Sequence, residues 1–150
     1  MKSFVLRVAL ALVGALGCGE KQGTDGRTAN VSTAGDIKPF ETELGLQFPA
    51  GTKLIGYHRE DGMDDYLGIK VEMPRAALKG FLASTPVAEE RYTDGEGGLL
   101  GPDGRGYWDP HRQPKLRTGQ AQLPGARALN IGYDDSRPDV AVVFVVTHGT

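Results

Sequence analysis

The segment Val140–Thr147 (VAVVFVVT) constrains the fold more than any other part of the sequence. Its residues are nearly all apolar and mostly β-branched, with no polar positions to mark one face as solvent-exposed. Such a strand is typical of the centre of a sheet that is covered on both sides. Eight residues are too few to cross a bilayer as a helix. We therefore expect a central strand with a layer of structure on each face.

Three further segments show the two-residue alternation of half-buried strands, at 52–59, 65–73 and 127–133. The first two are separated by an acidic turn that contains Asp61-Gly62, which predicts an antiparallel hairpin. A weaker pattern predicts a short strand within 115–123. The apolar residues expected on one face of each alternating segment are Ile55 and Tyr57, then Leu67, Ile69, Val71 and Met73, and then Leu129, Ile131 and Tyr133.

One helix is expected directly after the second strand. Pro74 cannot donate to a strand ladder but suits the first turn of a helix. In 75–84, Leu78, Phe81 and Leu82 form one apolar stripe. The preceding residues, 38–51, predict a lead-in with a short helical turn at 41–44. The fold class is therefore α+β: an antiparallel sheet of four to five strands, ordered strand-strand-helix-long loop-strand-strand, with one helix on one face.

The first seventeen residues have the three parts of a secretory signal. Lys2 and Arg7 form a positively charged n-region, and Val8–Leu16 forms an apolar h-region. Small residues precede Cys18, as at a cleavage site. Nine apolar residues in a helix rise about 13 Å, too little for a hydrocarbon core of about 30 Å. A removable signal peptide at 1–17 is therefore predicted, not a membrane span.

The residues Ala15-Leu16-Gly17-Cys18 resemble the lipobox of bacterial lipoproteins, although Ala15 stands where that family usually has leucine. The resemblance implies cleavage before Cys18, a diacylglyceryl group on its sulfur and acylation of its amine. Gly19 follows the cysteine instead of aspartate, which implies the outer membrane where the cell has one. The expected location is therefore the cell envelope, with the membrane as a partner through the lipid on Cys18.

The chain from Cys18 onward divides into a spacer at 18–37 and a single domain at 38–150. The spacer is polar and small, and about 19 residues of such coil reach roughly 25 Å. Without the two basic residues of the leader, the net charge falls from −2 to −4. Because nucleic-acid binding depends on basic surfaces, this balance argues against a nucleic-acid partner. Cys18 is the only cysteine, so the domain has neither disulfides nor a thiolate metal site.

No catalytic motif stands out in the domain, and no cofactor is expected. The acidic turn at 60–65 could bind Ca²⁺, but its spacing differs from that of an EF-hand, and a plain acidic turn is the preferred interpretation. His58, His111 and His148 could bind zinc, but their wide separation favours scattered surface histidines. The serines lack the G-x-S-x-G context of a hydrolase, and the glycine-rich stretch 95–106 matches no phosphate-binding motif.

The strongest candidate site is the set Tyr107, Trp108, Asp109, His111 and Arg112 in the long loop. Loops of this length are often functional, and Trp, Tyr and Arg dominate binding hot spots. In the alternative interpretation, which is slightly favoured, Trp108 fills the sheet face that a single helix cannot cover.

The domain also resembles small domains of uncharacterised bacterial lipoproteins. The resemblance lies in Gly62-Met63-Asp64-Asp65 before a strand, Pro74 opening a helix, and Trp108-Asp109-Pro110 before a final hairpin. It implies no activity. Three functions are therefore open: a non-enzymatic binding module for an envelope protein or component, an immunity-type or inhibitor lipoprotein that neutralises an envelope toxin or hydrolase, and a metal-dependent protein that uses the histidines and aspartates.

Overall fold

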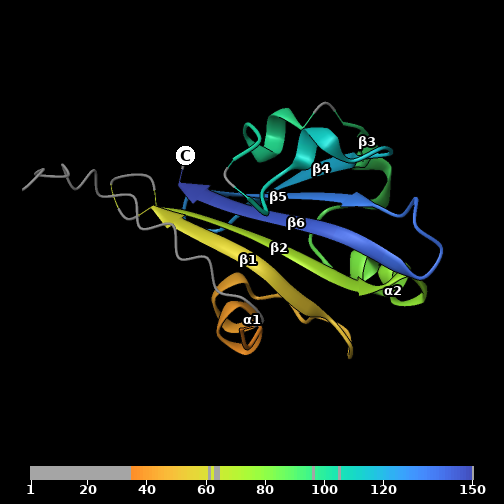
Figure 1. Cartoon of the computed structure of the whole chain (residues 1–150). Coiled ribbons are helices and arrows are strands. Elements are labelled where there is room, and N and C mark those ends of the chain that lie inside the picture. The colour runs from red at the N-terminus through yellow and green to blue at the C-terminus, as the bar shows by residue number, and fades with distance from the viewer. Residues whose placement is uncertain (1–34, 61, 63–64, 96, 105, 150) are drawn as a thin grey trace, which may run out of the picture.

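The computed structural model describes residues 35–60, 62, 65–95, 97–104 and 106–149. The fold is α+β, as predicted, but the open antiparallel sheet has six strands instead of the four to five expected, and two α-helices pack against it (Figure 1). The strand order is β1-β2-β6-β5-β4-β3. The strands are β1 (Lys53–Glu60), β2 (Tyr66–Pro74), β3 (Thr93–Asp94), β4 (Arg117–Leu123), β5 (Arg127–Asp134) and β6 (Val140–Gly149).

Strand β6 lies inside the sheet, between β2 and β5, as its two apolar faces predicted. Val143 and Val145 belong to the larger buried cluster on one face, whereas Phe144 and Val146 belong to a second cluster on the other. All four side chains are at most 1% exposed. We call the face of the larger cluster the helix face and the opposite one the loop face.

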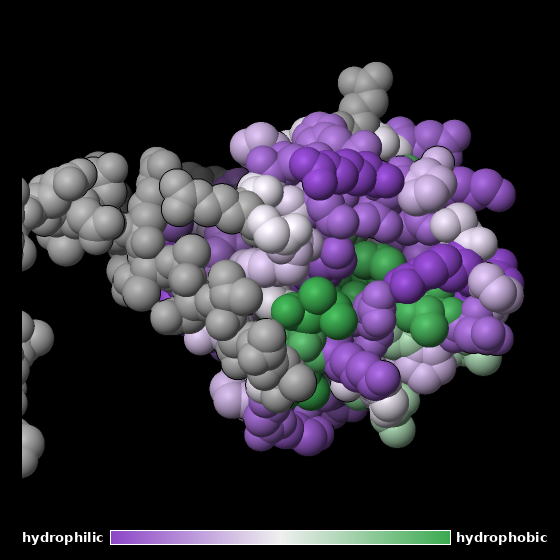
Figure 2. All heavy atoms as spheres, viewed as in Figure 1, coloured by the Kyte–Doolittle hydropathy of each residue, from purple (hydrophilic) through white to green (hydrophobic). Residues whose placement is uncertain are grey.

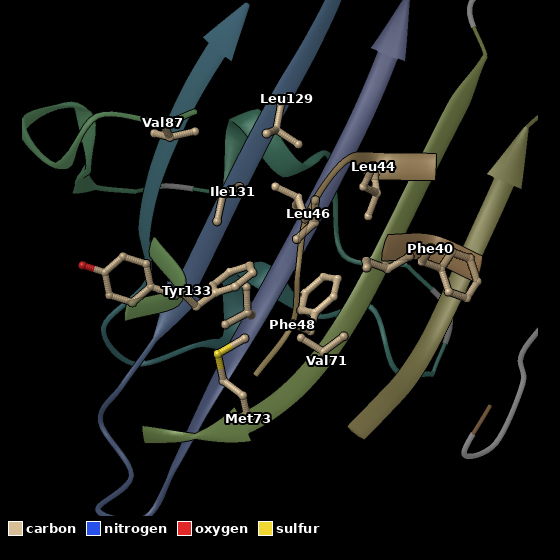
Figure 3. Close-up of a cluster of buried hydrophobic side chains, with 14 of the residues drawn as sticks. Phe40, Leu44, Leu46, Phe48, Val71, Met73, Val87, Leu129, Ile131 and Tyr133 are labelled. Atoms are coloured by element: carbon tan, nitrogen blue, oxygen red, sulfur yellow. The ribbon is translucent and has the colours of Figure 1, made fainter. Parts of the chain in front are cut away.

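Two helices cover the helix face, where the sequence predicted one. These are α1 (Lys38–Leu44) and α2 (Arg75–Ser84), the second with the predicted bounds. Helix α1 begins earlier than the expected turn because Pro39 is tolerated in the first turn, and it ends where Gly45 adopts a left-handed φ of 65°. Figure 3 shows Phe40, Leu44, Leu46 and Phe48, from α1 and the segment after it, above β1, β2 and β6.

Strand β1 departs from the predicted pattern. Leu54 and Tyr57 pack on the helix face, whereas Ile55 was expected there together with Tyr57. The cause is a register shift between Leu54 and Gly56, which is a β-bulge. A bulge adds one residue to the strand, so the inward positions come three residues apart instead of two. The predicted hairpin of β1 and β2 is otherwise confirmed.

The loop face is covered by the long connection 95–116, which we call the cover segment; it runs green to teal above the sheet in Figure 1. It contains two short 3-10 helices, η2 (Gly98–Leu100) and η3 (Pro110–Arg112); a third, η1 (Glu89–Arg91), precedes β3. Leu100, Trp108 and Leu116 of the cover segment pack against Val142, Phe144 and Val146 of β6. The cover segment thus buries the apolar side chains of the loop face, as the two helices bury those of the helix face.

Glycines in the strands make room for the side chains on this face. A Cβ atom at Gly56 would lie 2.6 Å from Cγ of Tyr107, and one at Gly132 would overlap Leu100. At Gly68 the obstruction is the imidazole of His58. A larger residue at any of these glycines would force the side chain above it to shift, so the side chains on this face are packed closely on the sheet.

Gly56→Ala is expected to lower the free energy of unfolding by about 2 kcal/mol, the usual cost of an extra methyl in a packed site. The matched control is Gly80→Ala in α2, where nothing lies within 4 Å of the new methyl. Because alanine favours a helix over glycine, that control should gain about 1 kcal/mol. Urea unfolding of both variants tests the pair. Equal stabilities for the two variants would show that Tyr107 does not occupy the position above Gly56.

Candidate functional site

The tether predicted at Cys18 and its spacer lie outside the described residues, apart from residues 35–37. Of the acidic turn, Asp61 and Asp64 also lie outside them, and Asp65 accepts a 3.4 Å hydrogen bond from the backbone N–H of Gly62. No helix in the described part of the chain is long and apolar enough to cross a membrane.

The five candidate residues of the cover segment do not form one exposed surface. Trp108 is 4% exposed and packs edge-on against Phe144, with ring centroids 5.2 Å apart. Its indole N–H donates to the carbonyl of Leu100 over 3.3 Å. Trp108 therefore lies in the core of the loop face, as the alternative interpretation expected. His111 and Arg112 are exposed, so a binding role for this loop stays a prediction that rests on those two side chains.

Asp109 forms an ion pair with a buried lysine. Its Oδ1 lies 2.6 Å from Nζ of Lys70, whose side chain is 11% exposed. The ammonium group also lies 5.4 Å from the centroid of the Phe144 ring, a favourable place for a cation. A charge this deeply buried requires its partner, so the pair joins the cover segment to the middle of the sheet.

Beside this pair lies an aromatic cluster built by His58, Tyr66, Tyr107 and Trp108. His58 stacks on Tyr66 at 4.9 Å and meets Trp108 edge-on at 4.7 Å, and its Nδ1 lies 3.4 Å from the Tyr107 hydroxyl. Burial lowers the pKa of His58 below its usual range and raises the pKa of Tyr107 to about 12. The cluster is therefore uncharged at neutral pH and serves as packing.

The three histidines have different surroundings. His58 belongs to the aromatic cluster, His111 lies over Gly97, and His148 lies 3.4 Å from the side-chain amide of Asn130. Among the described residues, no group of three His, Cys, Asp or Glu side chains is arranged to hold a metal ion.

A pocket lies on the helix face. It has a volume of about 460 Å³ and lies between the end of α2, the connection 85–92 and the strands β4 and β5. Its wall is mainly apolar, with Leu78, Leu82 and Val87 among its residues. We call it the α2–β4 pocket. Its size and lining suit a small molecule with an apolar body.

Tyr92 lines the α2–β4 pocket, but its hydroxyl is enclosed in the protein. Tyr92 is 4% exposed, and its hydroxyl oxygen has almost no accessible surface. The Thr85 hydroxyl donates to the carbonyl of Leu82 over 2.8 Å, which leaves the Thr85 oxygen to accept from Tyr92. Burial raises the pKa of Tyr92, and the side-chain hydrogen bond with Thr85 offsets part of that rise.

Arg117 links Tyr133 to the backbone of Tyr92 in the wall of this pocket. Its guanidinium donates to the hydroxyl of Tyr133 over 3.2 Å and to the backbone carbonyl of Tyr92 over 2.7 Å. The two tyrosine rings meet at 66° with centroids 5.4 Å apart. Figure 3 shows the Tyr133 ring pointing away from the other labelled side chains. The guanidinium therefore joins the Tyr133 hydroxyl to the backbone of Tyr92.

Charged residues of both signs lie around the pocket. Asp135 lies 3.5 Å from Arg75, whereas Lys79 and Glu89 have no ion-pair partner within the described part of the chain. Outside the pocket, the visible surface in Figure 2 is mainly hydrophilic, with small hydrophobic patches. Leu99 is the only large hydrophobic side chain described that is exposed. A broad apolar docking face is thus absent from the described residues.

The sequence did not reveal this pocket. Tyr92 lies in a region without periodicity, and Tyr133 was expected only as the last inward residue of its strand. Neither position carries a motif, because the site is made by bringing 78–92, Arg117 and Tyr133 together in the fold.

Comparisons with known proteins found no relative of this chain. No family model matches the chain, and neither a curated protein nor a solved structure matches it. The geometry described above therefore carries the functional argument.

Proposed function

We propose that this protein is a non-enzymatic binding module of the bacterial cell envelope, held to a membrane by lipid on Cys18, which binds a small ligand in the α2–β4 pocket. The observation that carries the proposal is a mainly apolar pocket of about 460 Å³ whose lining also includes Arg117 and Tyr133, joined by a hydrogen bond. The proposal differs from binding through the Trp108 loop, because Trp108 and Asp109 already have partners inside the domain.

The groups lining the pocket support binding more than catalysis. They are apolar side chains together with the hydrogen-bonded pair of Arg117 and Tyr133 and charged side chains of both signs at the edge. Burial raises the pKa of Tyr92 above its usual range, so that hydroxyl keeps its proton at neutral pH and acts as a donor, not as a base. Groups of this kind orient a bound molecule.

The pocket can be tested with a fluorescent apolar probe, N-phenyl-1-naphthylamine, titrated into the Cys18→Ser chain. The wild-type pocket should bind it, and Ala83→Trp should weaken binding at least tenfold, because Ala83 is exposed at the pocket and a large side chain there would fill it. The matched control is Ala76→Trp, an exposed position of α2 that does not line the pocket. An absence of binding, or equal binding by both tryptophan variants, would refute the pocket as the site.

The tether makes a separate prediction. In a bacterial host, the wild-type chain should be recovered in the membrane fraction, and the peptide that begins at Cys18 should carry the mass of the lipid. Cys18→Ser should move the protein to the soluble fraction, since each buried lipid CH₂ contributes about 0.8 kcal/mol to membrane binding. Recovery of a soluble wild-type protein with a free Cys18 thiol would contradict the lipoprotein assignment.

A further inference from the structure

We propose that the outer edge of β1 is a self-association surface, at which the β1 strands of two copies of this chain pair antiparallel about a twofold axis at Tyr57. The two sheets would then continue into each other across the axis. No residue of β1 lines the α2–β4 pocket, so the association does not depend on the ligand proposed there.

Strand β1 is a long strand at an edge of the sheet, drawn in yellow in Figure 1. It pairs with β2 on one side, and among the described residues none of 53–58 makes a backbone hydrogen bond outside that ladder. The opposite edge of the sheet ends in β3, which has only two residues. A very short edge strand is a common protection against pairing, whereas a long one presents a row of backbone donors and acceptors to another strand.

Symmetry restricts how two β1 strands can pair. A twofold axis perpendicular to the sheet keeps the loop faces of both copies on the same side, so opposed residues must lie on the same face. The bulge between Leu54 and Gly56 determines which residues share a face. Judged by their partners on β2, the loop-face residues are Lys53, Gly56, His58 and Glu60, and the helix-face residues are Leu54, Tyr57 and Arg59.

One register meets this condition and uses the whole strand. With Tyr57 opposite Tyr57 of the second copy, the bulge accommodates Ile55, and Lys53 lies opposite Glu60 of the second copy. Because the pairing is symmetric, Glu60 likewise lies opposite the second Lys53. The pairing thus places one pair of opposite charges at each end of the contact, on the loop face.

The order of the charges along β1 favours this pairing. Lys53 and Glu60 are exposed in the single copy, so a neighbouring strand can reach them. Charged side chains on an edge usually prevent pairing, but opposite charges directly across an antiparallel pair stabilise it. Arg59 would lie opposite Leu54 and is paired with Glu43 at 2.5 Å, so it places no like charge across the contact. The strand is therefore complementary to a second copy that runs in the opposite direction.

Sedimentation equilibrium of the Cys18→Ser chain measures the association, at concentrations up to about 500 µM because a contact between two single strands is small and its dimer is expected to be weak. The chain should form dimers and nothing larger, since a twofold contact closes on itself. Lys53→Glu and Glu60→Lys should each weaken dimerisation at least tenfold, because each opposes like charges at both ends. The chain with both substitutions should return to within about threefold of the wild-type dissociation constant.

The matched control is Lys79→Glu, which makes the same change of charge on α2 and should leave dimerisation unchanged. A chain that stays monomeric over the whole range would overturn self-association at β1. So would dimers that Lys79→Glu weakens as much as Lys53→Glu does, or dimers that the double substitution does not restore, because the contact would then lie elsewhere. None of these results bears on the α2–β4 pocket, which the titration with the fluorescent probe tests separately.

Discussion

Trp108→Ala should lower the free energy of unfolding by about 4 kcal/mol, within the range for removing a large buried aromatic side chain. Trp108 is 4% exposed and contacts Phe144, His58 and Tyr107 with its ring. Its loss would leave a cavity on the loop face and remove the donor to the Leu100 carbonyl. Domains of this size are stable by about 5–15 kcal/mol, so the variant would lose a large share of its stability.

Urea unfolding monitored by circular dichroism measures this effect. The control is Leu99→Ala, which truncates an exposed hydrophobic residue of the same segment and should change stability by less than about 0.5 kcal/mol. If both substitutions cost the same, Trp108 is not part of the core. The hypothesis that this loop is a binding surface would then regain support.

Asp109→Ala should cost about 3 kcal/mol, the lower end of the range for breaking a buried ion pair, because it leaves the Lys70 ammonium buried without its counter-charge. Asp109 itself is 25% exposed, so Lys70→Met, which strands the carboxylate instead, should cost only about 1 kcal/mol. Combining the two substitutions should restore most of the stability, since a buried pair replaced by apolar groups is often neutral.

The comparison of the three variants by denaturant unfolding isolates the interaction between the two charges. Simple addition of the single effects in the double variant would contradict a direct pair. It would mean that the Asp109 carboxylate stabilises the cover segment by some other contact.

Most of the sheet could be predicted from the sequence because each long strand carries its own pattern. The run of apolar residues in Val140–Thr147 predicted a central strand, and the alternation in 65–73 predicted a strand paired with 52–59; both are confirmed. The bulge at Ile55 could not be predicted, since it depends on how β1 meets β2 rather than on the composition of β1. Strand β3 has only two residues, too few to show any periodicity.

The candidate site was less predictable, because it also depends on contacts between segments that are far apart in the sequence. Trp108, Tyr107 and Arg112 were selected by residue type, and residue type alone does not separate a buried aromatic from an exposed one. The pocket residues Tyr92 and Arg117 become neighbours only when β3 and β4 pair. Contacts between segments far apart in the chain leave no local pattern to find.

The position of β6 has a consequence for how the chain reaches its folded state. The inner edge of the β1–β2 hairpin pairs only with β6, which follows the other five strands in the sequence. Tyr66, for example, pairs with His148, and such distant pairings slow folding. A growing chain would therefore hold an incomplete sheet until β6 emerged. Under the proposed export to the cell envelope, the chain would then reach the membrane with its sheet incomplete, a state that is easier to pass through a pore than a folded domain.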